Sequence, residues 1–188
     1  MDIKSFFSQI HQVPDEIMQE YLAAWSLFST NKKTLMTSPG EVERFMYFVI
    51  KGVQKSYYLK DGKQYVIAFT YSPSFTGIPE SFFTQTASKY YLETITDSEF
   101  LRISFEKHQE FMQKHRDIET LFRKGTEGIL AGVLERQYEL MALDIESRFR
   151  LFVRRSPHLL HLVPQKDLAS YLRIDPTNFS KLYNRIKI

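Results

Sequence analysis

Apolar residues recur at helical spacing in two short segments near the end of the chain, separated by only two residues. The first segment begins after Pro164, which suits the first turn of a helix, and the second begins at Asp175 and Pro176, which can cap and start a new helix. The apolar positions are Leu168, Ala169, Leu172, Ile174, Phe179, Leu182 and Ile186. Helices this short do not bury enough surface alone, so we expect them to share one small core. The pattern predicts a helix-turn-helix.

The second of these helices keeps a polar face. The residues on this face, which do not belong to the apolar pattern, are Thr177, Asn178, Lys181, Asn184 and Arg185. Asn and Lys side chains reach base edges in the major groove of DNA, whereas Ser180 and nearby cations would meet phosphates. A solvated face on an ordinary helical hairpin would show the same pattern, and this alternative stays open.

Between residues 34 and 104 the pattern changes to short runs of β-branched and aromatic residues. The predicted strands are Arg44–Ile50, Val53–Leu59, Gln64–Thr70, Tyr90–Ile95 and Phe100–Ser104. The Asp61-Gly62 pair between the second and third runs is a strong hairpin signal. This spacing favours a small antiparallel barrel or jelly roll.

Helical spacing dominates the remaining segments. The predicted helices cover Asp2–Ile10, Pro14–Leu27, Phe105–Arg116, Asp117–Leu143 and Ile145–Arg155. Apolar residues of the longest helix occupy more than one face, and Gly125, Gly128 and Gly132 each cost it roughly 1 kcal/mol relative to Ala. We expect a second backbone to approach it closely, as in a homodimer paired through Ile118–Leu143. Burial against the rest of the same chain is the alternative.

The amino-acid composition limits the catalytic and metal-binding chemistry open to the protein. The 188 residues include no cysteine, which excludes disulfides, thiolate zinc sites and a catalytic thiol. The five histidines all lie outside residues 34–104, which argues against a metal site on the strands. The sequence has no Gly-rich phosphate loop and no serine elbow. We therefore expect no catalytic residues and no metal, and an enzyme is the least favoured class.

The distribution of charge favours a DNA-binding protein, and the hydropathy argues against a membrane-spanning one. From residue 144 onward nine Lys or Arg stand against four Asp or Glu, whereas residues 1–143 have sixteen against eighteen. DNA binding through counterion release needs such a basic excess beside the reading helix. No apolar run approaches the ~18 residues that a membrane-spanning helix requires. We expect a cytoplasmic protein without a membrane partner.

Both halves of the chain resemble the Crp/Fnr superfamily, the bacterial regulators related to the cyclic-AMP receptor protein. The C-terminal likeness rests on the core positions listed above from Leu168 to Leu182, and the roll resembles the family's cyclic-nucleotide-type sensor in residues 47–53, 61–63, 74–77 and 93–99. The resemblance implies an α+β fold with an N-terminal antiparallel β-roll and flanking helices in residues 1–116. A dimerisation helix in residues 117–143 and a helix-turn-helix DNA-binding domain in residues 144–188 would follow.

The resemblance also assigns DNA-contacting positions. Base-reading sites fall on Pro176, Thr177 and Lys181, and the phosphate-facing start of the first helix falls on Gln165 and Lys166. Combined with the polar face, the predicted DNA-binding residues are Gln165, Lys166, Thr177, Asn178, Ser180, Lys181, Asn184 and Arg185.

Two departures from the family pattern stand at the same end of the chain. Arg173 occupies a turn position where the family usually has Gly, so it would enter the left-handed conformation at a cost of roughly 1 kcal/mol. The sequence ends at Ile188, which leaves no residues for a C-terminal wing hairpin.

The family's ligand positions fall on Gly77, Ile78, Ser88 and Lys89. Binders of cyclic AMP carry an acidic residue for the ribose at the place of Ile78 and an Arg-Ser pair for the phosphate at the place of Ser88-Lys89. Because Ile78 cannot accept a ribose hydroxyl and Lys lacks the bidentate fork of Arg, we expect weak or no cyclic-AMP binding. Another small anionic effector could meet N–H groups of a helical turn at Pro79–Phe83. A pocket filled by aromatic side chains is the alternative.

These observations predict a dimeric transcription regulator that binds duplex DNA, with RNA polymerase as a candidate further partner. The competing class is a ligand- or protein-binding module that retains the sensor roll but reads no DNA.

Overall fold

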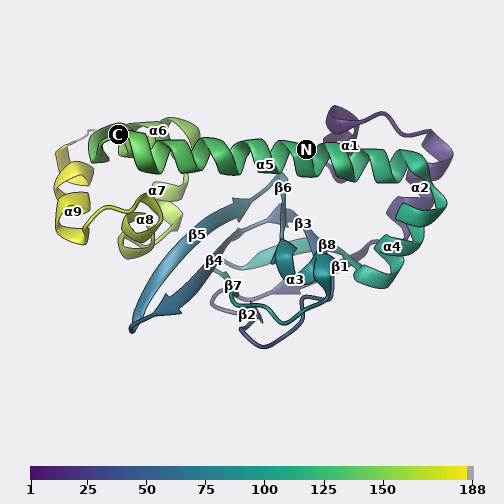
Figure 1. Cartoon of the computed structure of the whole chain (residues 1–188), viewed down its shortest axis with the longest axis horizontal. Coiled ribbons are helices and arrows are strands. Elements are labelled where there is room, and N and C mark those ends of the chain that lie inside the picture. Colours follow the sequence, from purple (N-terminus) through teal and green to yellow (C-terminus); the bar gives the residue numbers. More distant parts are fainter. Residues whose placement is uncertain (186–188) are drawn as a thin grey trace.

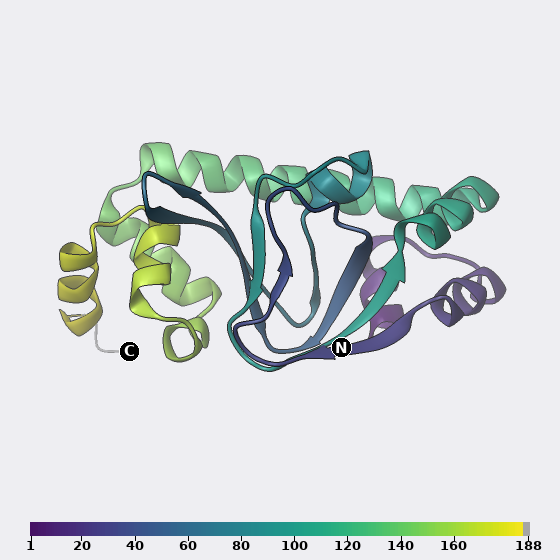
Figure 2. The ribbon, with the colours of Figure 1, turned by 90° about the horizontal axis from the view of Figure 1, so that it is seen from below.

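The computed structural model describes residues 1–185. Figure 1 shows the long helix α5 running along one side of the whole molecule, with the N-terminal helices at one end and the C-terminal helices at the other. In the perpendicular view of Figure 2 the β-roll lies between these two groups of helices. The arrangement places the two ends of α5 against different partners.

Within residues 1–185, two four-stranded antiparallel sheets form the roll, in the orders β1-β8-β3-β6 and β2-β7-β4-β5. The strands are β1 Ser26–Thr30, β2 Leu35–Thr37, β3 Phe45–Lys51, β4 Val53–Lys60, β5 Lys63–Tyr71, β6 Ser74–Thr76, β7 Tyr91–Thr94 and β8 Ser98–Ser104. In the second sheet, β5 is an edge strand. This edge faces the C-terminal helices, a contact described below.

The runs of β-branched and aromatic residues identified five of the strands, β3, β4, β5, β7 and β8, and the prediction of a β-roll is confirmed. The predicted hairpin joins β4 to β5, where Asp61 and Gly62 both have positive φ (51° and 70°), as a two-residue I′ turn requires. Glycine is required at Gly52, whose φ is 97°, because an added Cβ would lie 2.7 Å from the carbonyl oxygen of Asp97. The short strands β1, β2 and β6 were not predicted.

One predicted boundary is wrong. The helix expected at Pro14–Leu27 ends at Ala23, and Ser26 and Leu27 already belong to β1, where they pair with residues of β8. The side chain of Leu27, counted in the predicted helix, is 76% exposed. The backbone ladder to β8, which lies more than seventy residues away in sequence, decides this boundary, whereas local spacing does not show it.

The remaining helical boundaries agree with the predictions to within two residues. The helices are α1 Ile3–Ile10, α2 Asp15–Ala23, α3 Pro79–Thr84, α4 Phe105–Lys114, α5 Arg116–Ala142, α6 Ile145–Arg155, α7 Leu159–Leu162, α8 Gln165–Leu172 and α9 Pro176–Arg185. The short helix α7 was not predicted. In residues 1–185 no helix combines the length and the apolar character that crossing a membrane would need.

An aromatic core anchors the first half of α5. Phe7 and Tyr21 from α1 and α2 are fully buried, and they pack with Ile118, Leu121 and Phe122 of α5. The rings of Phe7 and Phe122 meet edge-on with their centroids 5.7 Å apart. Large aromatic side chains bury more apolar area than any others, so this end of α5 is firmly attached to the roll domain.

The second half of α5 presents an uncovered apolar stripe. Its members are Ile129, Leu130, Val133, Leu134, Tyr138 and Met141, each between 57% and 77% exposed. A Cβ added at Gly128 or Gly132 would meet no atom within 4 Å. The wide apolar pattern that predicted a second partner is therefore not explained by burial within residues 1–185.

Candidate nucleic-acid interface

Helices α8 and α9 meet at a tight turn at the predicted place. Arg173 ends α8 with φ of 56°, so the left-handed conformation expected for it is confirmed. The N–H of Ile174 donates to the carbonyl of Ala169 at 3.0 Å and closes the turn. Asp175 then caps α9, because its Oδ1 accepts from the N–H of Thr177 at 2.9 Å.

A compact apolar core fixes the angle between these two helices. Phe149 of α6 and Phe179 of α9 are each at most 1% exposed, and their rings meet edge-on at 5.4 Å between centroids. The other buried members from the C-terminal helices and turns are Phe152, Leu159, Leu160, Val163, Leu168, Ala169, Leu172, Ile174 and Leu182. Every core position predicted from Leu168 to Leu182 is buried here. Ile186, predicted to extend the apolar face of α9, lies outside the described residues.

The eight residues predicted to contact DNA are all exposed: Gln165, Lys166, Thr177, Asn178, Ser180, Lys181, Asn184 and Arg185. The last six lie on α9, on the surface that remains after Phe179 and Leu182 enter the core. Arg185 forms an ion pair with Glu146 of α6. Figures 1 and 2 show α9 on the outer side of α8, at one end of the molecule. This helix therefore presents hydroxyls, amides and cations on an accessible convex surface.

Helix α8 is attached to the roll by contacts that sequence reasoning missed. Lys55 of β4 reaches Asp167 of α8 at 2.9 Å between Nζ and Oδ2, and these side chains are only 7% and 4% exposed. The hydroxyl of Ser170 accepts from the N–H of Val66 at 3.0 Å and donates to the carbonyl of Gln64 at 2.9 Å. Ser170 thus bonds the backbone of edge strand β5 as a neighbouring strand would. No local pattern relates positions 55 and 167.

The four predicted ligand positions lie on either side of helix α3 in the sequence, and they differ in burial and in hydrogen bonding. Ile78 is 3% exposed and directly precedes α3, whereas the Lys89 side chain is 77% exposed and lies 3.7 Å from Glu80. The hydroxyl of Ser88 donates to the carbonyl of Tyr90 and accepts from its N–H, at 2.8 and 2.9 Å. Gly77, with φ of 148°, directly precedes Ile78. The predicted helical turn at Pro79 is present as α3.

Glu43 is an unpredicted buried carboxyl group beneath this segment. It accepts from the hydroxyl of Thr37 at 2.5 Å, and its own N–H donates to the hydroxyl of Ser81 in α3. Burial raises the pKa of Glu43 to about 7, against the opposing effects of the Thr37 hydroxyl and the N–H groups of Phe45 and Ile78. Glu43 therefore contacts α3 through its backbone N–H, and its buried carboxyl group titrates near neutral pH.

Within residues 1–185, no three His, Asp or Glu side chains gather in a group that could hold a metal ion. Two of the histidines are instead part of the packing. His108 is fully buried beside the Tyr21 hydroxyl at 3.0 Å, and the ring of His158 packs edge-on against Tyr71 at 4.4 Å between centroids.

Comparison with known proteins gives a consistent picture. Residues 29–115 match the cyclic nucleotide-binding domain family. The structure is similar to FixK2 from Bradyrhizobium japonicum, with a TM-score of 0.73, 18% identity, and coverage of 86% of this chain and 83% of that one. A putative Crp/Fnr-family regulator from Eubacterium rectale gives a TM-score of 0.71 at 11% identity, covering 92% and 82%.

A third similar structure is the c-di-GMP-responsive global regulator CLP of Xanthomonas campestris, with a TM-score of 0.64, 18% identity, and coverage of 92% and 91%. No curated protein matches the sequence as a relative. The likeness to these structures extends beyond the roll to the long helix and the C-terminal helices, since it covers most of each chain. Residues 29–115 thus match the cyclic nucleotide-binding domain family, and the chain as a whole is similar in fold to solved regulators that include a member of the Crp/Fnr family.

Proposed function

We propose that the protein is a homodimeric transcription regulator of the Crp/Fnr type that places α9 in the major groove of duplex DNA. The observation that carries this proposal is the exposed face of α9, where Thr177, Asn178, Lys181 and Asn184 project from a helix whose other side is fixed in a core. Amide and hydroxyl groups match the donor and acceptor patterns of base edges, and cations match phosphates. Gln165 and Lys166 at the start of α8 would contact the backbone of the same groove.

The apolar stripe of α5 supports the dimer. In a parallel pair of α5 helices, Ile129, Val133 and their neighbours would leave water, and the open sides of Gly128 and Gly132 would let the two backbones approach closely. A two-fold axis along this pair would set two α9 helices to read half-sites about 34 Å apart, one turn of DNA.

We also propose that the sensor roll does not bind cyclic AMP and that any effector of the roll is a different small molecule. Ile78 is buried where an acidic residue would be needed for the ribose, and Lys89 extends into solvent beside Glu80. Ser88 already uses its hydroxyl on Tyr90. A cytoplasmic site of action and contact with RNA polymerase belong to the same proposal, because both follow from transcription regulation.

The direct test is selection of duplexes from a random pool by the purified full-length protein, followed by fluorescence anisotropy across a salt series. We expect an inverted repeat with half-sites about one helical turn apart to be enriched. Affinity for it should fall steeply with salt as counterions are released. If no sequence is enriched and no duplex binds at low salt, the chain is better explained as a protein-docking module.

Two substitutions on α9 then test the face itself. Lys181→Ala and Asn178→Ala should each weaken binding to the selected duplex by about 1–3 kcal/mol, with Asn178→Ala also relaxing preference at one base position. Lys107→Ala is the matched control, since Lys107 is an exposed lysine on α4 whose ion-pair partner is Glu110. Equal losses in all three variants would show nonspecific attraction rather than reading by α9.

A further inference from the structure

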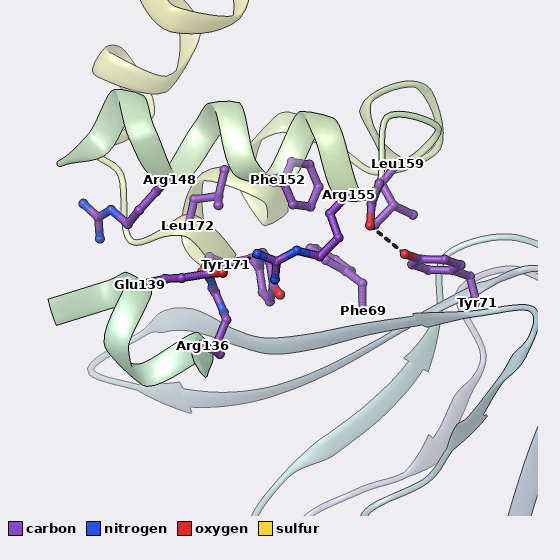
Figure 3. A pocket seen from close by; sticks show the side chains of 11 residues that line it. Phe69, Tyr71, Arg136, Glu139, Arg148, Phe152, Arg155, Leu159, Tyr171 and Leu172 are labelled. Carbon is purple, nitrogen blue, oxygen red and sulfur yellow. Dashed lines mark hydrogen bonds and ion pairs between the residues drawn. The ribbon is translucent and has the colours of Figure 1, made fainter. Parts of the chain in front are cut away.

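A cavity of about 120 Å³ lies where α5, α6, α8 and strand β5 meet. Figure 3 shows side chains from these elements around it, with Arg136 and Glu139 coming from α5, Arg155 from α6, and Tyr171 from α8. The roll contributes Phe69 and Tyr71, both on β5. This cavity is separate from the region around α3 and from the exposed face of α9.

The charged groups of the cavity are unbalanced. Three arginines, Arg136, Arg148 and Arg155, line it together with one carboxylate, Glu139. Glu139 is 6% exposed; it pairs with Arg155, and it also lies 3.9 Å from Arg136. Within residues 1–185 Arg148 forms no ion pair within 4 Å, although its charge lowers the pKa of Asp144 at the start of α6, and its Nε is buried without a hydrogen bond. Among the residues that line the cavity, one carboxylate therefore stands against three arginines.

Arg136 is held in place, whereas the Arg155 side chain pairs with Glu139 but stays 53% exposed. The guanidinium of Arg136 lies over the ring of Tyr171, with its central carbon 3.8 Å from the centroid, and it also donates to the Tyr171 carbonyl. Burial lowers the pKa of Arg136, and the charges of Arg155 and Arg148 add to this effect, while Tyr171 and Glu139 oppose it. Three cations that share one carboxylate in a partly dry site are costly, and an anion would relieve that cost.

The cavity lies beside the surface of the dimer proposed above. Successive residues of an α-helix are turned by 100°, so Glu139 lies at least 120° around α5 from Val133, Leu134 and Met141, whereas Arg136 is 60° from Val133 at the edge of the stripe. Arg148 and Arg155 belong to α6, so a small anion that enters the cavity would supply their counter-charge.

We infer that this cavity is a binding site for a small phosphate-bearing anion. Guanidinium forks match the paired oxygens of a phosphate group. The Tyr71 and Ser156 hydroxyls, 2.6 Å apart at the cavity wall, offer neutral hydrogen-bonding groups beside them. A volume of about 120 Å³ is below the ~300–1,000 Å³ of pockets that hold drug-sized ligands, so a cyclic nucleotide would not fit.

An anion bound here would connect three parts of the molecule. It would contact the end of α5, helix α6 and the wall formed by α8 and β5, so it would favour the docked position of α8 over any other position. The site does not depend on DNA binding, because none of its residues belongs to the exposed face of α9.

The test is thermal unfolding of the full chain in increasing sodium phosphate, with the ionic strength held constant by sodium chloride. A ligand that binds only the folded state raises the Tm with its concentration. We expect this rise for the unmodified protein and, in Arg148→Gln, a half-maximal effect shifted to at least about tenfold higher concentration, since one charge-assisted contact is lost. Glu139→Gln should shift it to lower concentration, because the opposing carboxylate is removed.

Two controls make the result specific. Arg154→Gln removes an exposed arginine from the same helix, and Lys181→Ala removes a cation from the α9 face; both should keep the full phosphate response. Repeating the series with glycerol 3-phosphate shows which kind of anion the cavity prefers. A stronger effect of inorganic phosphate would indicate free phosphate as the ligand, and a stronger effect of glycerol 3-phosphate would indicate a phosphorylated metabolite. An equal response in Arg148→Gln and the unmodified protein, or no response to either anion, would overturn the inference.

Discussion

Glu43 shows how a single buried group can make stability depend on pH. Its pKa of about 7 in the folded protein compares with 4.5 when it is exposed, so between these values the folded state holds more protons than the unfolded state. Stability contributed by this group is therefore fully present below about pH 4.5 and is lost as the pH rises through about 7. The physical reason is that ionisation leaves a charge in a buried site.

We expect Glu43→Gln to be close to the unmodified protein in stability at pH 4.5 and more stable at pH 8. The difference should approach about 3 kcal/mol, at 1.4 kcal/mol per pKa unit. Urea unfolding at several pH values measures it, beside Glu99→Gln, which removes an exposed carboxylate from the same roll. A constant difference between Glu43→Gln and the unmodified protein at all pH values would contradict the assigned pKa.

His108 makes this comparison between variants necessary. Burial lowers the pKa of His108 to about 4, so its contribution to stability is lost as the pH falls from 6.5 through 4. That trend runs opposite to the one from Glu43. The pH profile of the unmodified protein alone would combine the two, whereas the difference profile isolates Glu43.

Among the elements, the edge strand β5 and helix α8 form the main joint between the roll and the C-terminal helices. The joint combines the Ser170 hydrogen bonds to β5 with the buried Lys55–Asp167 ion pair. Lys55 is also 3.6 Å from Glu93. Burying charges is costly, so this pair contributes to stability only while both partners are present.

We expect Lys55→Met to destabilise the protein by about 3–5 kcal/mol, because it leaves Asp167 buried without its partner. Asp167→Asn should cost less, since Lys55 keeps Glu93. The double variant should be more stable than the sum of the single losses predicts, which a double-mutant cycle by urea unfolding measures. Lys51 and Glu99, an exposed pair 3.7 Å apart, provide the control cycle, where a coupling below about 1 kcal/mol is expected. Equal coupling in both cycles would contradict the role of burial.

At the scale of the whole molecule, α5 connects an anchored end and an uncovered end. Its first turns enter the aromatic core with α1, α2 and α4, while its later apolar stripe faces solvent. An exposed stripe of this kind on a folded protein marks an interaction surface. The proposed dimer would cover it and hold two copies of α9 at a fixed separation.

We expect Leu134→Arg to convert the dimer into a monomer, because a charge would be buried between the two helices. Light scattering after size-exclusion chromatography measures the mass, and affinity for the selected duplex should fall with it. The control variant Glu135→Arg carries arginine at the next position of α5, which points away from the stripe. This variant should remain dimeric. A monomer in the unmodified protein at micromolar concentration would contradict this role of α5.

The elements that could be predicted from the sequence are those with a strong local period. Helix α6 at Ile145–Arg155 and strand β4 from Val53 carry such a period. The Asp61-Gly62 pair marks the turn after β4, because both residues tolerate the positive φ that the turn needs. The exposed positions of α9 follow from the apolar positions beside them. By contrast, β1 and β2 are short, and their pairing with β8 and β7 is the reason they are strands at all.

The sequence by itself therefore determined the longer helices, five of the strands, the helical pair at the end of the chain and the polar face of α9, because periodicity and capping act over a few residues. Only the tertiary structure decided that Lys55 meets Asp167, that Ser170 bonds the edge of β5, that Glu43 is buried, and that Arg136, Arg148 and Arg155 surround one cavity. These contacts join residues distant in sequence. Burial and charge balance at such places depend on how the elements pack, which no local pattern specifies.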